Sequence, residues 1–461
     1  MVVLGMPQRL PGGVSKVNVS VDERRKLGLI PKDFLGLGYE ISSVSTAGLL
    51  SPRNASYVNL MRNLGAAGVV RIGGLTADDA SFMPDAAAMP DAAAVSKAKG
   101  SVVNLANLRE LASLLRATGW KLIWCLNLGS GSAEEAATEA VAVDREMGDR
   151  LLALEIGNEP DGFHAGSFAH RAPAYGYDDY LQEYRRYKEA IRKKLPSAPF
   201  AGPDAASKTD WVTRFAADEG RDLKMLTHHY YRECANPTST LDKLLHTDPK
   251  LAPMLEKLRA ATAASGVPFR ICETNSFCGG GKPGVSDTFG AALWALDFLW
   301  KLAEGGCAGV NMETGVNQLD FVSSYSPIAD NSAKPEYYGM LAFAQAVGGE
   351  RVSVEIDAGD LNLSAYAARQ GRAVLVTLIN KETAAVVDVQ ITASARFGSA
   401  KALRLTAPSL ESKEGVTFGG SSVSKQGEWK PHKAEGLAFK DRQCEVHLNP
   451  ASAVVIALKT E

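Results

Sequence analysis

The sequence predicts an α/β fold, a (β/α)8 TIM barrel with a C-terminal all-β sandwich, and three observations lead to this prediction. Short apolar runs alternate with helical patterns eight times before Gly349. Such alternation specifies a parallel sheet with helices outside, and eight units favour a closed barrel, which typically needs about 250 residues before insertions. After Gly349 the helical patterns stop, and short strands separated by Gly, Asp, Asn, Ser and Pro follow, as in a β-sandwich.

Each predicted barrel strand is a short apolar run that ends in a polar residue or a glycine turn. The first is Phe34–Glu40, and the second, Ala67–Gly74, closes with the turn R-I-G-G. An open doubly wound sheet usually carries a glycine-rich nucleotide loop after its first strand, and R-I-G-G lacks that spacing. The closed barrel is therefore the prediction. In order, the strands end at Glu40, Arg71 with Gly73-Gly74, Asn127, Asn158-Glu159, Asp204, His228 with Tyr230, Glu273 and Glu313.

The helical patterns between these strands complete the predicted organisation. Residues 1–13 form a tail and residues 28–348 the barrel. Residues 349–461 form the sandwich, and residues 14–27 are expected to join it. In this N-terminal segment Val17, Val19 and Val21 alternate with polar residues as in a half-buried strand. The helices are expected at 57–64, 105–115, from 134 onward, 180–194, 211–217, 254–264, 288–302 and 337–346.

Composition limits the possible partners. The 461 residues carry a formal charge of −2, so charge gives no reason to expect nucleic-acid binding. No apolar run approaches the ~20 residues of a membrane helix, and we expect no membrane partner. The first residues show no signal-peptide h-region, so we expect a cytoplasmic protein, or a secreted or periplasmic one if a signal was removed. We expect a monomer.

The cysteines form neither a disulfide framework nor a zinc motif. Six in a chain of this length are few, and their spacing matches no metal site, so we expect no metal and no cofactor. Cys125, Cys272 and Cys307 lie in apolar runs and are expected in the core. Cys234 and Cys278 lie on loops, where we expect them to be exposed.

Two glutamates are the candidate catalytic groups. Glu159 follows the fourth strand in L-L-A-L-E-I-G-N-E-P, and Glu273 ends the seventh in F-R-I-C-E-T-N-S. The active site of such a barrel lies at the C-terminal ends of its strands. In retaining glycosidases two carboxyl groups sit ~5–5.5 Å apart, and one attacks while the other shuttles the proton. We therefore expect Glu159 and Glu273 to face each other across a sugar.

Three neighbouring features are candidate binding groups. Asn158 precedes the fourth-strand glutamate, and its amide can hydrogen-bond a hydroxyl next to the reacting carbon. His228 and Tyr230 stand two apart on one strand, so both side chains point the same way. A tyrosine there can hold the seventh-strand glutamate ionised by donating a hydrogen bond. The glycines 279–281 expose backbone N–H groups that can bind a carboxylate.

These motifs resemble glycoside hydrolase family 79, the heparanases and β-glucuronidases, and within it the bacterial heparanases most of all. The matches run in order along the whole barrel, and the C-terminal β domain fits as well. The motif that begins at Glu273 is long and specific. The matches are R-I-G-G with Asp78, G-N-E-P around Glu159, G-P-D at 202–204, H-H-Y-Y at 228–231, and E-T-N-S-F-C-G-G-G-K-P-G-V-S-D-T-F from Glu273.

The resemblance implies roles for several of these residues. It implies retention of configuration, with Glu159 as acid/base and Glu273 as nucleophile. It also implies a glucuronate whose carboxylate meets the backbone amides of Gly279 and Gly280. A tyrosine from the loop after the eighth strand completes that carboxylate site, and Tyr325 is the candidate.

Two positions and one region depart from the family pattern. Glu40, which the resemblance places against a sugar hydroxyl, stands where the animal heparanase has Asp and exo-acting bacterial glucuronidases have Glu. Cys278 stands where relatives usually carry Tyr. The basic heparin-binding segments of the animal enzyme are not evident.

The predicted function is that of a retaining glycoside hydrolase that cleaves β-glucuronosyl linkages, as a heparanase-like endo-β-glucuronidase on heparan sulfate-type glycosaminoglycans. Its expected partner is a glucuronate-containing oligosaccharide or polysaccharide. Three alternatives stay open: an exo-β-glucuronidase of the same family, an arabinofuranosidase or xylosidase on the same plan, and a non-catalytic carbohydrate-binding protein.

Overall fold

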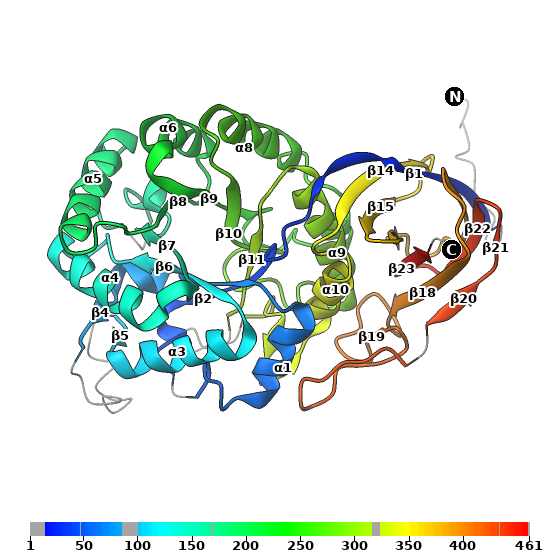
Figure 1. Cartoon of the computed structure of the whole chain (residues 1–461), viewed down its shortest axis with the longest axis horizontal. Helices are drawn as coiled ribbons and strands as arrows, with labels where there is room; N and C mark the ends of the chain where they lie inside the picture. Colours follow the sequence, from blue (N-terminus) through cyan, green and yellow to red (C-terminus); the bar gives the residue numbers. More distant parts are fainter. Residues whose placement is uncertain are drawn as a thin grey trace, which may run out of the picture.

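A closed barrel of eight parallel strands forms the larger part of the molecule (Figure 1). The computed structural model describes residues 14–46, 48–84, 100–166, 169–315, 323–432 and 434–459, so the predicted tail at 1–13 lies outside the described residues. The strands follow the chain around the barrel, and the last pairs back to the first. The predicted barrel is confirmed. Its strands are β2 (Leu35–Glu40), β3 (Val69–Gly73), β6 (Lys121–Leu126), β7 (Leu151–Ile156), β8 (Phe200–Ala205), β9 (Leu223–Tyr231), β10 (Phe269–Asn275) and β11 (Val310–Glu313).

Helices cover the outside of this barrel (Figure 1). Local sequence sets where they begin: at the start of α4, Ser132 accepts from the N–H of Glu135, whose carboxylate accepts in return from the N–H of Ser132. Most residues of α9 are buried, so this helix has no polar face. The helices are α1 (Ala55–Leu64), α3 (Leu105–Thr118), α4 (Ala133–Met147), α5 (Tyr177–Lys194), α6 (Thr209–Glu219), α7 (Leu241–Leu245), α8 (Leu251–Ser265), α9 (Phe289–Glu304) and α10 (Pro335–Ala344).

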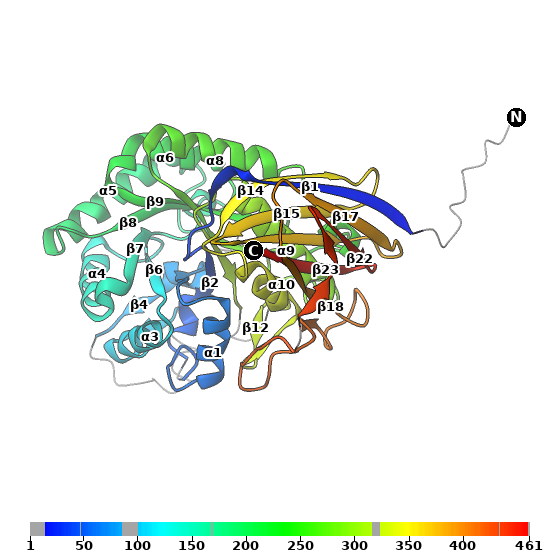
Figure 2. The ribbon, with the colours of Figure 1, turned by 45° about the vertical axis from the view of Figure 1, so that its right-hand side comes forward.

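The second domain is one hydrogen-bonded sheet, curled so that its inner faces share a core. The N-terminal strand β1 (Ser15–Leu29) pairs antiparallel with β14 and parallel with β17, and it runs along the β domain in Figure 2. Val17, Val19 and Val21 point into that core. The other main strands are β14 (Glu350–Asp357), β15 (Leu363–Gln370), β16 (Ala373–Asn380), β17 (Val387–Ala393), β18 (Ser399–Thr406), β22 (Gln443–Leu448) and β23 (Ser452–Lys459), with short strands β19 (Thr417–Phe418), β20 (Glu435–Leu437) and β21 (Phe439–Lys440).

A buried polar cluster joins the two domains. Asp297 on α9 accepts hydrogen bonds from Lys381 at 2.9 Å and from the hydroxyl of Tyr366 at 2.7 Å, both from the β domain. The ring of Tyr366 stacks on Trp300, also on α9, with ring centroids 5.2 Å apart. Because a buried carboxylate without partners is costly, this cluster favours the observed docking of sheet on helix.

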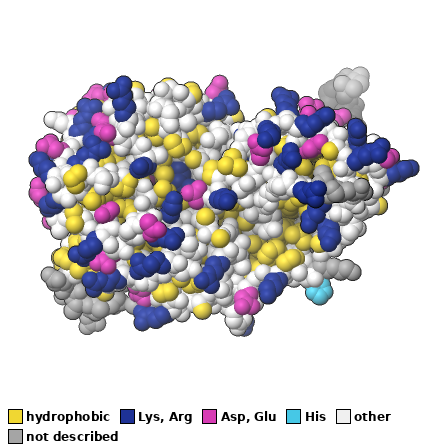
Figure 3. All heavy atoms as spheres, in the orientation of Figure 1, with side chains coloured by type: hydrophobic (Ala, Val, Ile, Leu, Met, Phe, Trp, Pro, Cys, Tyr) yellow, Lys and Arg dark blue, Asp and Glu magenta, His cyan; other side chains and the backbone are white. Residues whose placement is uncertain are grey.

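The surface carries mixed charge. On the face shown in Figure 3, basic and acidic side chains are interspersed over both domains. Within the described ranges, none of the helices combines the length and the apolar character needed to cross a bilayer.

Candidate active site

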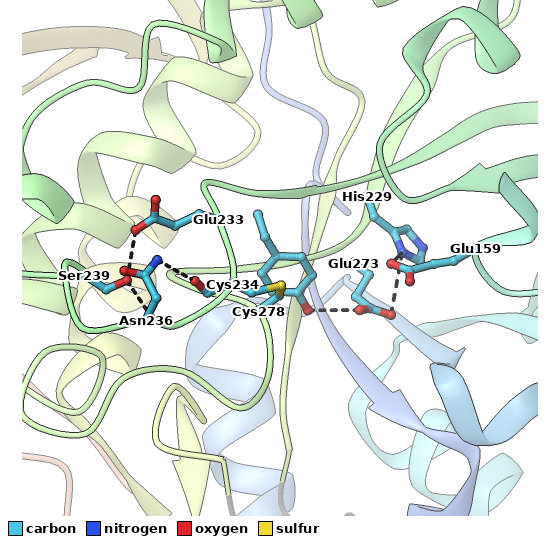
Figure 4. Close-up of a disulfide and its surroundings, with 9 residues drawn as sticks. Glu159, His229, Glu233, Cys234, Asn236, Ser239, Glu273 and Cys278 are labelled. Carbon is cyan, nitrogen blue, oxygen red and sulfur yellow. Dashed lines mark hydrogen bonds and ion pairs between the residues drawn. A yellow bond between two sulfur atoms is a disulfide. The ribbon is translucent and has the colours of Figure 1, made fainter. Parts of the chain in front are cut away.

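The two predicted glutamates meet at the C-terminal mouth of the barrel. Glu159 follows β7, and Glu273 lies on β10. One carboxylate oxygen of each lies within 4.8 Å of the other and of a nitrogen of His229. Figure 4 shows these carboxylates beside the imidazole. Both glutamates are half-buried, whereas His229 is buried, so the pair remains open to a ligand. This separation suits two groups that act on one anomeric carbon with retention.

The turn that carries Glu159 is held in an unusual conformation. Glu159 has φ 50°, in the left-handed region, which costs a non-glycine residue on the order of 1–3 kcal/mol. Its backbone N–H donates to the carbonyl of Asp204 on β8 at 3.0 Å, which holds the turn in place. The preceding Asn158 is buried, and its Nδ2 has no partner among the described residues. The contact of Asn158 with a substrate hydroxyl stays a prediction.

Arg71 fixes the nucleophile candidate from below. This fully buried guanidinium on β3 donates from Nη1 to Glu273 at 2.8 Å and from Nε to Glu155 at 3.2 Å. From Nη2 it donates to Asp204 and to the Oδ1 of Asn158. A hydrogen bond between a buried guanidinium and a carboxylate is short and directional. Arg71 therefore holds the Glu273 carboxylate in a fixed orientation.

His229 links the two glutamates to the barrel interior. Its Nδ1 lies 2.9 Å from Glu159 and 3.8 Å from Glu273, and its Nε2 lies 2.8 Å from Asp204. Burial alone would lower the pKa of His229, but the charges of Asp204 and Glu273 and the hydrogen bonds outweigh it and raise the pKa well above its usual value. A nitrogen of His229 and one oxygen of each glutamate lie within 4.8 Å of one another, and a protonated imidazole would have to lose its proton before it could bind a metal ion.

The assignment of His228 and Tyr230 to the substrate site is wrong. Side chains alternate along β9, and Met225 belongs to the small cluster inside the barrel. The side chains of His229 and Tyr231 therefore point into the barrel, on the same face of β9 as Met225. The Nδ1 of His228 lies instead 2.6 Å from the carbonyl of Ala205, and the hydroxyl of Tyr230 donates to Asp248. H-H-Y-Y offers the same pair of residue types in either register, and β9 is buried on both faces, so alternation gave no signal.

Tyr231 takes the role that had been expected of Tyr230. Its hydroxyl donates to Oε1 of Glu273 at 2.9 Å, opposite the contact from Arg71. Burial, and then the charge of Glu273, raises the pKa of Tyr231 well above its usual value, so it remains a hydrogen-bond donor at neutral pH. Each carboxylate oxygen of Glu273 thus accepts one hydrogen bond from a fixed donor.

Two further carboxyl groups line the site, and both have raised pKa values. Burial raises the pKa of Glu40 to about 7, although its carboxylate also accepts from Thr76. Burial, followed by the charges of Glu273 and Glu40, raises the pKa of Glu313 well above its usual value. Neither oxygen of Glu313 has a partner among the described residues. A Cβ at Gly38 would lie 2.5 Å from one of them, so only glycine leaves room for this carboxyl.

The glycine loop after β10 lies beside these groups. Gly279 and Gly280 adopt left-handed conformations, with φ 75° and 85°, and Gly279 is exposed. The carbonyl of Gly280 accepts from the backbone of Ser324 at 2.8 Å, which brings the loop against the segment that carries Tyr325. Tyr325 is buried, with its ring centroid 6.4 Å from that of Tyr231. The predicted carboxylate-binding groups are thus gathered on one side of Glu273.

Cys234 and Cys278 are joined by a disulfide, which the sequence analysis did not predict. Cys234 is exposed and Cys278 half-buried, so the loop placement agrees with the sequence, but neither is a free thiol. The free cysteines Cys125, Cys272 and Cys307 are buried. The sequence separation of 44 gave no sign that the two loops adjoin.

Comparison with known proteins shows similarity to glycoside hydrolases of family 79. Residues 365–455, in the β domain, match the family model described as the glycosyl hydrolase family 79 C-terminal beta domain. The chain is 29% identical over 378 residues to a β-glucuronidase of Neurospora crassa, in an alignment that covers 73% of this chain and 67% of the fungal enzyme. The chain is therefore similar to the glycoside hydrolases of family 79.

Two further proteins with glycan-cleaving names are similar to this chain. Heparanase of Bos taurus is 26% identical over 224 residues, which cover 45% of this chain and 38% of that protein, well under two thirds of its length. A solved structure of a 4-O-α-L-rhamnosyl-β-D-glucuronidase from Fusarium oxysporum superposes with a TM-score of 0.76 at 19% identity, covering 95% of this chain and 100% of that chain. The barrel and the β domain of this chain therefore share their overall fold with that enzyme.

Proposed function

We propose that this glycoside hydrolase is a retaining β-glucuronidase. The observation that carries the proposal is the approach of one oxygen of Glu159 to within 4.8 Å of one oxygen of Glu273. This distance leaves room for direct attack on the sugar, whereas inverting enzymes separate their carboxyl groups by ~6.5–9.5 Å to admit a water. The intact carboxylate pair also argues against a non-catalytic carbohydrate-binding protein.

In the proposed reaction Glu273 is the nucleophile and Glu159 the acid/base. Glu273 attacks the anomeric carbon while the protonated Glu159 gives its proton to the leaving oxygen, forming a glycosyl ester on Glu273. Glu159 then removes a proton from water, which attacks the same carbon and releases Glu273. Desolvation raises the pKa of Glu159, and the negative charge of Glu273 raises it further, although His229 opposes both. Once Glu273 is esterified its charge is gone, the pKa of Glu159 falls, and the ionised Glu159 is available as the base.

The glycine loop supports the choice of a glucuronide. Among the described residues no group accepts a hydrogen bond from the N–H of Gly279 or of Gly280. Two N–H groups without a described partner, in a loop hydrogen-bonded to the residue before Tyr325, suit a carboxylate. An arabinofuranoside or xyloside has no carboxylate to place there, so these readings leave the loop unexplained. The name of the Neurospora crassa relative, β-glucuronidase, agrees.

We propose heparanase-like endo action on heparan sulfate-type chains, with the enzyme working as a monomer. A groove of about 700 Å³ lies between the barrel loops and the β domain, and it is lined in part by Ser324, whose hydroxyl donates to Gly280. Further sugar residues of a chain fit beside the carboxylate site there. Exo action is the second candidate. The alignment with the fungal β-glucuronidase covers 73% of this chain, whereas the alignment with the bovine heparanase covers 45%, so the similarity to the β-glucuronidase extends further.

The disulfide supports a secreted or periplasmic location over a cytoplasmic one, because such bonds form and persist in oxidising compartments.

One comparison of substrates tests the function. Aryl β-glucuronide should be hydrolysed, and aryl β-xyloside and aryl α-L-arabinofuranoside should be hydrolysed far more slowly, because only the glucuronide carries a carboxylate. Digestion of heparan sulfate should yield intermediate oligosaccharides early. Release of monosaccharide alone would reject endo action. If none of these substrates were hydrolysed, the proposed glucuronidase function would be rejected.

Replacing Tyr231 by phenylalanine should lower kcat on the aryl glucuronide about ten- to a hundredfold, because a hydrogen bond to a charged group is lost. Tyr230→Phe is the matched control: it removes the same hydroxyl from the next residue, but that hydroxyl contacts Asp248 away from the site. Its kcat should stay near that of the wild type. Equal losses in the two variants would contradict the placement of Tyr231 against Glu273.

A further inference from the structure

A disulfide joins the two loops that follow the tyrosine and the nucleophile. Cys234 lies three residues after Tyr231, and Cys278 lies five after Glu273 and directly before Gly279. The backbones also pair here: the N–H of Cys278 donates to Glu233 at 3.0 Å, and the N–H of Ala235 donates to Cys278 at 3.1 Å. The bridge thus extends the contact between β9 and β10 beyond the ends of both strands.

The Cys234 side of the bridge is the anchored side. Glu233 accepts from the hydroxyl of Ser239 at 2.9 Å and forms an ion pair with Lys243. The side-chain amide of Asn236 donates to the carbonyl of Cys234 at 3.0 Å. Figure 4 shows this network on one side of the disulfide and the catalytic glutamates on the other.

The Cys278 side leads into three successive glycines, which have the greatest freedom to lose on ordering. Gly279 and Gly280 hold φ values of 75° and 85° in this loop. Beyond them the carbonyl of Gly280 accepts from the backbone and the hydroxyl of Ser324, at 2.8 and 2.9 Å. The two free N–H groups therefore lie between one covalent anchor, at Cys278, and one hydrogen-bonded anchor, at Ser324.

We propose that the Cys234–Cys278 disulfide positions the loop that binds the substrate carboxylate. It ties Gly279 and Gly280 to the well-anchored Cys234 loop and so holds their N–H groups toward that carboxylate. The inference rests on the proposed glucuronidase function. Without the bridge the glycines regain their freedom, and ordering them costs binding energy. Glu273, Arg71 and Tyr231 keep their own contacts, so the chemical step is little affected.

The Cys234→Ala/Cys278→Ala double variant tests this with an aryl β-glucuronide. KM should rise about tenfold or more, the range expected for weakened hydrogen bonds to a charged group, while kcat changes less than about threefold. Cys444→Ala is the control, because it removes a buried free thiol from the β domain. Its KM should match that of the wild type. Thermal melting of each variant is the check that the fold is retained.

Reduction of the wild-type enzyme is the second arm, and it needs no mutation. Dithiothreitol gives two electrons and two protons to the exposed bridge, leaving two thiols and its own cyclic disulfide. KM of the wild type should rise to that of the double variant, and the double variant should not respond to the reductant.

The outcomes separate the two proposals. An unchanged KM after the bridge is removed, or a fall in kcat with KM unchanged, would overturn the positioning role and leave the glucuronidase function standing. Absence of glucuronide hydrolysis by the oxidised wild-type enzyme would overturn both.

Discussion

Replacing Glu273 by glutamine is expected to lower kcat on an aryl β-glucuronide by about four powers of ten or more, the loss typical of a missing nucleophile. The amide keeps the shape of the side chain, but it is a poor nucleophile and cannot form the glycosyl ester. It also turns an acceptor of two fixed donors, Arg71 and Tyr231, partly into a donor. Steady-state kinetics with circular dichroism as a check on folding measures the effect.

Glu313→Gln is the matched control for that experiment. Glu313 sits in the same ring of carboxyl groups, but burial and the charges of Glu273 and Glu40 raise its pKa, which favours the neutral form. An amide replaces a neutral carboxylic acid of nearly equal shape, and the loss should stay within about tenfold, the effect of one altered hydrogen bond. If Glu273→Gln keeps more than about a hundredth of the wild-type rate, or if the control falls as far, Glu273 is not the nucleophile.

Replacing Glu159 by alanine is expected to have an effect that depends on the leaving group. A phenyl β-glucuronide needs a proton on its leaving oxygen, and the loss of general-acid catalysis should cost about 10²- to 10⁴-fold. The dinitrophenolate of a 2,4-dinitrophenyl β-glucuronide leaves without needing a proton, so the rate of the first step on this substrate should change little. Pre-steady-state release of the phenol measures that step separately. A similar loss on both substrates would contradict an acid role for Glu159.

The same residue sets the sign of the pH dependence. Desolvation raises the pKa of Glu159, and only its protonated form is a general acid. With the phenyl substrate, kcat/KM of the wild type should therefore hold below that raised pKa and fall as the pH rises through it. The alkaline fall should vanish in Glu159→Ala, and its persistence there would assign the limb to another group.

The fold and the meeting of the two glutamates could be predicted because both follow from features that run along the chain. Eight apolar runs with helical patterns between them leave few alternatives to a barrel, and the ends of parallel strands must share one rim. Glu159 and Glu273 each stand at such an end, so their meeting follows from topology. The β domain was recognisable for the same reason, since its strands are short and regularly interrupted.

What the sequence did not reveal depends on contacts between distant segments. His229 and Tyr231 differ from the predicted His228 and Tyr230 by one residue of register, and a strand buried on both faces carries no alternation to set it. Arg71 looks like part of a turn in the sequence, and only the closed barrel brings Glu155, Asp204 and Glu273 around it. The Cys234–Cys278 bridge likewise depends on two loops that become neighbours only when β9 pairs with β10.

The central claim is that Glu273 forms a bond to the anomeric carbon while Glu159 lies on the other side of the departing oxygen. Incubation with 2-deoxy-2-fluoro-β-D-glucuronosyl fluoride tests it most directly, because the 2-fluorine slows both steps and the good leaving group lets the first proceed. Mass spectrometry of the digested protein should find one fluoroglucuronosyl group, attached to the peptide that contains Glu273. A label on any other residue, or an unlabelled protein that releases the α-anomer from a β-glucuronide, would contradict the account.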